Sequence, residues 1–188
     1  MMPLNVPNLV TLSRIILIPL LIGIFYLPWL SEETKNVTAT AVFIFAGITD
    51  WLDGYLARRL NQMSAFGAFL DPVADKLIVV AALLALLYLD RVDMIVALII
   101  IGREIAISAL REWMAKVGQA ASVAVAFIGK LKTVVQMIAI PLLLFYDYLL
   151  GLDCQWLGTI LINVAAVLTV VSMLYYLRKA LPYASVRG

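Results

Sequence analysis

Residues 50–75 read DWLDGYLARRLNQMSAFGAFLDPVAD, and this stretch places four aspartates next to long apolar segments. Asp50 and Asp53 lie three residues apart, and Asp71 and Asp75 lie four apart, so each pair shares one face of a helix. Unpaired charges are costly in a lipid environment and mark functional sites there. The composition of the rest of the chain decides whether that environment applies.

The chain has 188 residues, of which 64% are hydrophobic and 14% are charged. Soluble domains hold about 45–50% apolar and about 25% charged residues, so an ordinary soluble domain is excluded. The apolar residues come in runs long enough to cross a bilayer, without the alternation of a barrel. We predict an all-α polytopic membrane protein with a single domain over residues 1–188. The six expected transmembrane helices cover residues 9–29, 37–57, 71–89, 94–115, 132–150 and 157–177.

Basic residues are divided unequally between the two ends of these segments. Lys35 and Arg91 are the only two of the 14 Lys and Arg residues in the connections far from the termini. The positive-inside rule therefore predicts that both termini face the cytoplasm. The net charge of +2 is small and scattered and gives no reason to expect nucleic acid. The N-terminus lacks the features of a secretory signal, so its apolar segment is expected to remain as a helix.

Few kinds of chemistry are open to this sequence. It has no His, and Cys154 is its one cysteine, which excludes histidine bases, histidine-ligated zinc and an internal disulfide. Asp50, Asp75 and Arg14 reach about the same depth, roughly 10 Å from the cytoplasmic boundary. We expect the four carboxylates to converge there around a divalent cation, since oxygen ligands suit Mg²⁺, Mn²⁺ or Ca²⁺.

Other readings of the aspartates remain open. Any one of them can pair with Arg58, Arg59 or Lys76, and Asp71 before Pro72 has the pattern of a helix N-cap. A divalent-cation transporter would also place acids inside the membrane. Its acids should continue across the membrane, however, and the far halves of the six segments have none.

The same stretch resembles the signature of the CDP-alcohol phosphatidyltransferase family, D-x2-D-G-x2-A-R-x8-G-x3-D-x3-D, at all eight fixed positions. Members join a CDP-linked lipid to an alcohol and release CMP. The resemblance implies two Mg²⁺ or Mn²⁺ ions on Asp50, Asp53, Asp71 and Asp75, with Asp75 also taking the proton of the acceptor hydroxyl. It also implies that Gly54, Ala57, Arg58 and Gly67 contact the CDP-diacylglycerol nucleotide.

Polar residues enter the first segment at the depth of the aspartates. Asn8, Thr11 and Arg14 follow three-residue steps and are expected to hold the same nucleotide. The alternative is hydrogen bonding between helices with a structural pair between Arg14 and an aspartate.

Two later stretches, REIAISALREWMA at 103–115 and GKLKTVVQM at 129–137, resemble family members whose acceptor is glycerol 3-phosphate. A phosphorylated acceptor needs a basic pocket opposite the aspartates. The expected residues of this pocket are Arg103, Arg111, Lys130, Lys132 and Thr133.

Alternatives exist here too. Arg103 and Glu104 can form a purely structural network, and Lys132 can be a simple anchor at the cytoplasmic surface. Another acceptor, such as serine, inositol phosphate or a lipid, is the alternative reaction. The resemblance further implies a homodimer. The compact chain without targeting extensions predicts a bacterial inner membrane, and the depth of the aspartates predicts an active site just inside its cytoplasmic interface.

Overall fold

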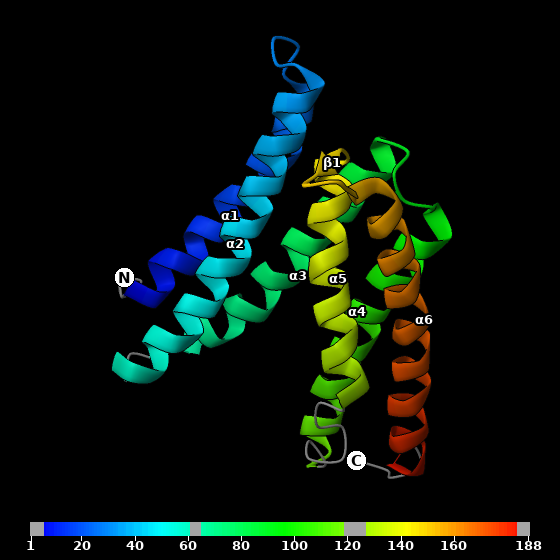
Figure 1. Ribbon diagram of the computed structural model, residues 1–188. Helices are drawn as coiled ribbons and strands as arrows, with labels where there is room; N and C mark the ends of the chain where they lie inside the picture. Colours follow the sequence, from blue (N-terminus) through cyan, green and yellow to red (C-terminus); the bar gives the residue numbers. More distant parts are fainter. Residues whose placement is uncertain (1–5, 61–64, 119–126, 184–188) are drawn as a thin grey trace.

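The computed structural model describes residues 6–60, 65–118 and 127–183, and six long helices dominate these ranges (Figure 1). The α-helices are α1 (Val6–Gly23), α2 (Glu32–Leu60), α3 (Ala65–Tyr88), α4 (Met94–Lys116), α5 (Phe127–Phe145) and α6 (Cys154–Ala180). Short 3-10 turns, Ile24–Tyr26 and Leu181–Tyr183, extend α1 and α6.

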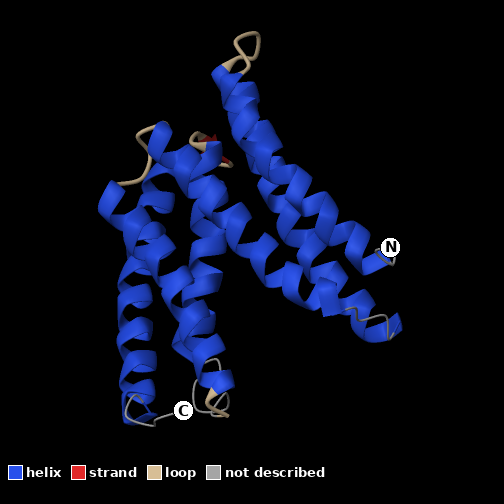
Figure 2. Ribbon diagram, turned by 180° about the vertical axis from the view of Figure 1, so that it is seen from behind, coloured by secondary structure: helices blue, strands red, loops and turns tan. Residues whose placement is uncertain are grey.

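The helices run alternately up and down. Helices α1 and α2 form a pair that is tilted away from α4, α5 and α6, and α3 crosses between the two groups (Figures 1 and 2). Helix α1 packs against α2 and α3, α6 packs against α4 and α5, and α2 contacts α5. The connections 27–31, 89–93 and 146–153 all lie at one end of the bundle (Figure 1).

Small side chains allow the helices to approach closely in the core. Ala39, Ala82 and Ala139 are completely buried, on α2, α3 and α5 respectively. Larger residues such as Leu83 and Leu143 fill the spaces between them. This is the packing expected of helices that associate inside a membrane, where close van der Waals contact replaces the hydrophobic effect.

Two helices begin at side-chain caps. Asp93 Oδ1 accepts a hydrogen bond from the Ile95 amide at 2.7 Å, and Asp153 Oδ1 accepts one from the Trp156 amide at 2.9 Å. Aspartate is a preferred N-cap because it satisfies amides that have no partner within the helix. Helices α4 and α6 start at the same end of the bundle (Figure 1).

The prediction that Asp71 caps the start of a helix is wrong, since α3 begins at Ala65 and contains both Asp71 and Pro72. A proline removes one backbone hydrogen bond but does not have to end a helix, and membrane helices tolerate it. The other expected boundaries differ by a few residues. Helix α1 ends six residues before the predicted residue 29, and α5 begins and ends five residues earlier than the predicted range 132–150.

A short hairpin explains why α5 ends early. Tyr146 has φ 58°, which is incompatible with a continuing helix, and strands β1 (Tyr148–Leu149) and β2 (Leu152–Asp153) pair directly afterwards. Leu150 and Gly151 between them both have positive φ, 52° and 83°. Two positive φ values are typical of a tight two-residue hairpin turn.

The described helices include two that are long and apolar enough to cross a membrane by length and composition, Phe127–Phe145 and Cys154–Tyr183. Apolar side chains also cover much of the outside of the bundle. Leu98, Val167 and Leu174 are each at least 60% exposed. An apolar outer surface of this kind is suited to lipid.

Candidate active site

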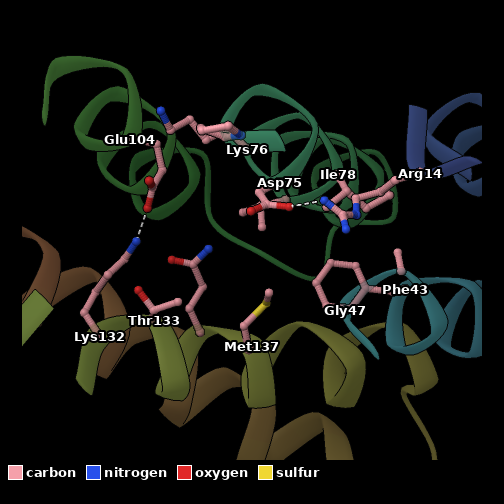
Figure 3. A pocket seen from close by; sticks show the side chains of 14 residues that line it. Arg14, Phe43, Gly47, Asp75, Lys76, Ile78, Glu104, Lys132, Thr133 and Met137 are labelled. Atoms are coloured by element: carbon pink, nitrogen blue, oxygen red, sulfur yellow. Dashed lines mark hydrogen bonds and ion pairs between the residues drawn. The ribbon is translucent and has the colours of Figure 1, made fainter. Parts of the chain in front are cut away.

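A cavity of about 270 Å³ lies where five helices meet (Figure 3). It contains charged groups of both signs within a mostly apolar wall. Its lining residues are Arg14 from α1; Phe43, Ala46 and Gly47 from α2; Pro72, Asp75, Lys76, Ile78 and Val79 from α3; Glu104 from α4; and Lys132, Thr133, Gln136 and Met137 from α5. Residues far apart in the sequence are therefore assembled around one space.

Asp75 and Arg14 form an ion pair at this cavity. Arg14 Nη1 donates to Asp75 Oδ1 at 2.5 Å, so α1 and α3 are joined at this level. The Arg14 side chain is 1% exposed, whereas that of Asp75 is 41% exposed. The sequence left open a structural pair between Arg14 and an aspartate, and the structure contains it. The same pair leaves the Asp75 carboxylate at the edge of the cavity (Figure 3).

The opposite wall of the cavity is basic and comes mainly from α5. Lys132 is 1% exposed and donates to Glu104 Oε1, which connects α5 to α4 (Figure 3). Because Lys132 is buried, the alternative that it is a surface anchor is wrong. Thr133 lines the cavity beside it, and its hydroxyl donates to the Gly129 carbonyl at 3.0 Å.

Lys76 and Gln136 are cavity residues that the sequence did not single out as site residues. Lys76 directly follows Asp75 and donates to the Ser108 hydroxyl on α4. Gln136 is buried and lies one helical turn after Lys132. The four-residue spacing of Lys132 and Gln136 was a usable signal, because polar residues at that spacing share one face of a helix.

The remaining residues of the expected acceptor pocket lie outside the cavity lining. Arg103 is buried and contacts Glu104, which lines the cavity: its Nη1 lies 3.6 Å from Glu104 Oε1. Arg111 lies further along α4, with its guanidinium carbon 5.5 Å from the centre of the Tyr176 ring. Lys130 is exposed. The structure thus brings Lys132 and Thr133 to the cavity and connects Arg103 to it through Glu104.

The expected metal ligands lie on α2 and α3, which are consecutive along the chain. Asp53 and Asp71 are about 10 Å along their helices from the end of α2 and the start of α3 respectively, and Asp50 and Asp75 are each about 15 Å from these points. Each aspartate on one helix therefore has a counterpart at a matching level on the other. Oxygen donors in such a set suit a hard divalent cation.

Of these four aspartates, only Asp75 has a described side chain, so the described residues contain no group of three potential metal ligands. The side chains of Asn8, Thr11, Gly54, Ala57, Arg58 and Gly67 are likewise outside the described part of the structure, although their backbone lies in α1, α2 and α3.

An apolar groove continues from the cavity to the outside of the bundle, between α2 and α5. It has a volume of about 350 Å³ and is lined by Phe43, Ile44, Gly47, Ile48 and Met137. Three of these residues, Phe43, Gly47 and Met137, also line the cavity. A Cβ atom at Gly47 would meet nothing within 4 Å, so the junction between cavity and groove is open.

Comparisons with known proteins agree on one family. The model of the CDP-alcohol phosphatidyltransferase family matches residues 4–171. A CDP-diacylglycerol–glycerol-3-phosphate 3-phosphatidyltransferase of Salmonella choleraesuis is 48% identical over 181 residues, which cover 95% of this chain and 96% of that protein. A protein of the same name from Haemophilus influenzae is 47% identical over 183 residues, covering 95% of each chain.

Proposed function

Because this chain belongs to the CDP-alcohol phosphatidyltransferase family, we propose that it transfers the phosphatidyl group of CDP-diacylglycerol to glycerol 3-phosphate, giving phosphatidylglycerophosphate and CMP. The observation that carries this proposal is the extent of the similarity. Relatives named for this activity are 47–48% identical over 95% of the chain. The similarity is thus spread over the whole helical bundle.

The cavity supports this reaction because it combines an acid with basic groups in a mostly buried space. Asp75 and Arg14 lie on one side, and Lys132 with Thr133 lies on the other (Figure 3). A phosphorylated acceptor suits the basic side, since ammonium groups bind phosphate strongly when water is excluded.

In the proposed reaction, the acceptor hydroxyl oxygen bonds to the phosphorus that carries the diacylglycerol. The bond from that phosphorus to the CMP oxygen breaks, and CMP leaves with the bonding electrons. Asp75 accepts the proton of the attacking hydroxyl, a role that requires a carboxylate within reach of the substrate. Arg14 holds this carboxylate in place from α1 and offers positive charge to the pyrophosphate.

We assign the cofactor site to Asp50, Asp53, Asp71 and Asp75 as ligands of two divalent cations, Mg²⁺ or Mn²⁺. Bound ions of this type neutralise the pyrophosphate and the leaving group. The matching levels of the aspartates on α2 and α3 support this assignment. Around the cytidine nucleotide we place Asn8, Thr11, Arg14, Gly54, Ala57, Arg58 and Gly67.

The apolar groove supports a lipid donor. A substrate with a charged head and apolar tails needs a polar cavity that opens directly onto an apolar surface, and the α2–α5 groove gives such an opening. We place an acyl chain of CDP-diacylglycerol along Ile44, Ile48 and Met137, residues that are 45%, 56% and 37% exposed.

The site also has a proposed place in the cell. We place all six helices across a bacterial inner membrane, with both termini and the active site on the cytoplasmic side. The positions of Lys35 and Arg91 support this orientation, as do the three connections at the opposite end of the bundle (Figure 1). We also propose that two copies form a homodimer, which the mass of the protein in detergent would test.

One assay tests the function. Purified protein in detergent receives CDP-diacylglycerol with glycerol 3-phosphate, serine, inositol phosphate or no acceptor, and CMP release is measured. We expect release with glycerol 3-phosphate, its loss in EDTA, and recovery with Mg²⁺ or Mn²⁺. A preference for serine would overturn the assignment of the acceptor, and full activity in EDTA would overturn the metal site.

A further inference from the structure

Tyr176 on α6 is completely buried, and it lies against two arginines of α4. The Arg103 guanidinium carbon is 6.0 Å from the centre of its ring, and that of Arg111 is 5.5 Å from it. Arginines over an aromatic face at this range are attracted to the ring, most strongly where water is excluded. The Tyr176 ring therefore attracts both guanidinium groups, two positive charges that would otherwise repel each other.

The surroundings fix the ring and Arg103 tightly. Arg103 Nη2 donates to the buried Ser172 hydroxyl at 3.3 Å, one helical turn before Tyr176. A Cβ atom at Gly129 would lie 3.1 Å from the Tyr176 hydroxyl oxygen and 3.6 Å from Arg103 Nη2. Helix α5 can approach this pair so closely because residue 129 is glycine.

The charges of this cluster are not balanced by the described side chains around it. Arg103, Arg111 and Lys132 carry three positive charges, and Glu104 is the acid that the described contacts place among them. In addition, the Nε atoms of Arg103 and Arg111 are buried without a hydrogen-bond partner in the described structure. An excess of about two positive charges, with Arg103 and Lys132 buried and Arg111 half-buried, matches a phosphate dianion when its donors are unused.

The cluster is connected to the cavity of the proposed active site. Glu104 contacts both Arg103 and Lys132, and Lys132 lines the cavity. Ser108, which lies between Glu104 and Arg111 on α4, accepts a hydrogen bond from Lys76, the residue after Asp75. An acceptor phosphate held by these arginines would thus lie beside the helix that carries the proposed base.

We propose that Tyr176 is a positioning residue for the acceptor, whose ring holds Arg103 and Arg111 together as a binding site for the phosphate of glycerol 3-phosphate. The role rests on the proposed function. Tyr176 acts through the arginines and does not touch the substrate. Tyr176 therefore affects the binding of glycerol 3-phosphate, and the binding of CDP-diacylglycerol does not depend on it.

The test changes the electronic character of the ring while keeping its size. Phenylalanine, 4-fluorophenylalanine and 3,4,5-trifluorophenylalanine are introduced at position 176, since fluorine weakens the attraction of an aromatic face for cations. We expect the KM for glycerol 3-phosphate to rise stepwise with fluorination, by at least about fivefold in total. The KM for CDP-diacylglycerol and the melting temperature should stay constant along the series.

Tyr175 provides the matched control. It is the neighbouring residue, it is 39% exposed, and its ring faces a different cation, with Lys179 Nζ 4.9 Å from the ring centre. The same substitutions at position 175 should leave both KM values unchanged. Tyr176→Leu is a further variant that should raise the KM for glycerol 3-phosphate by at least the same factor. If this variant does not fold, the fluorinated series alone tests the positioning role.

The outcomes separate the two proposals. A wild-type protein that releases no CMP with glycerol 3-phosphate overturns the proposed function, and the role of Tyr176 falls with it. An active enzyme whose KM for glycerol 3-phosphate is constant along the series at position 176 overturns the positioning role alone. An equal change in the KM of both substrates would make Tyr176 a packing residue and would also overturn it.

Discussion

Asp75 is the residue on which the proposed chemistry depends most directly. It lines the cavity with 41% of its side chain exposed, whereas its partner Arg14 is buried. An acid that is held on one side and open on the other can accept a proton from a bound substrate. A purely structural pair would have no need for that opening.

We predict that Asp75→Asn lowers CMP release by about 100-fold or more, since a general base contributes about that much. Binding of CDP-diacylglycerol, measured directly with a radiolabelled lipid, should persist. Glu112→Gln is the control, because Glu112 is an exposed acid of α4 that pairs with Lys116 at 2.9 Å. Normal CMP release by the Asp75→Asn variant would contradict the role of Asp75 as the general base.

A second prediction about single residues concerns the Lys132–Glu104 pair. Removing one member of a buried pair costs up to about 3–5 kcal/mol, and less where the remaining charge keeps another partner, as Glu104 keeps Arg103 here. Lys132→Met should therefore lower the melting temperature in detergent by no more than the double variant Lys132→Met/Glu104→Gln, which also removes the acid that faces Arg103. Both should raise the KM for glycerol 3-phosphate. If the double variant regained normal acceptor binding, Lys132 would be structural only.

At the scale of the elements, Arg91 joins the connection after α3 to α2 and α5, at the end of the bundle opposite the active site. It donates to the carbonyls of Leu143 and Leu144 at 3.2 and 2.9 Å and to Asn36 Oδ1 at 2.9 Å. Its guanidinium carbon also lies 4.1 Å from the centre of the Tyr146 ring. Burial lowers the pKa of Arg91 from its ordinary value, but arginine stays protonated at neutral pH.

Arg91→Met should destabilise the protein by about 1.5–3 kcal/mol, because hydrogen bonds to a charged group are lost and the last carbonyls of α5 lose their partner. Thermal unfolding in detergent measures the change. Lys35 at the same end is the comparison, since it pairs with Glu32 on its own helix at 2.7 Å and joins no other element through that contact. Equal losses from Lys35→Met and Arg91→Met would contradict the bridging role.

The α2–α5 groove gives a prediction about the lipid. Gly47→Leu should place a side chain at the open junction of cavity and groove, where a Cβ atom meets no neighbour within 4 Å. We expect the KM for long-chain CDP-diacylglycerol to rise at least about tenfold, with little loss of stability, as a lost apolar contact of this size implies. A short-chain analogue should be affected less.

The control for the groove is Gly23→Leu, at the end of α1. Gly23 has helical dihedrals and also has nothing within 4 Å of a Cβ atom, but it lines neither the cavity nor the groove. It should leave the KM for the lipid unchanged. A normal KM in the Gly47 variant would place the acyl chain elsewhere.

For the whole molecule, the alternation of the helices predicts its orientation. The C-terminal end of α2 and the N-terminal end of α3 lie at one end of the bundle. The connections 27–31, 89–93 and 146–153 lie at the other end (Figure 1). If the latter face the periplasm, residue 61 faces the cytoplasm. A single cysteine at Asn61, in a protein whose buried Cys154 is replaced by Ala, should react with an impermeant reagent only after the cells are opened. Labelling in intact cells would contradict the orientation.

The sequence by itself determined the helical class, the approximate positions of the six helices and the family. Each depends on local information, namely the length of apolar runs and the spacing of D-x2-D-G-x2-A-R and the residues after it. It did not determine where helices begin near proline, as Asp71 and Pro72 illustrate, because a proline is compatible with both a helix start and a helix interior.

Only the tertiary structure decided which polar residues meet. The pairing of Arg14 with Asp75 spans 61 residues and that of Lys132 with Glu104 spans 28, so their contacts depend on how helices pack and rotate. No local pattern distinguishes Tyr176 from the other aromatic residues of its apolar helix, and the packing of α4 against α6 brings Arg103 and Arg111 to its ring. Such contacts arise from the packing of whole helix faces, which a local pattern does not specify.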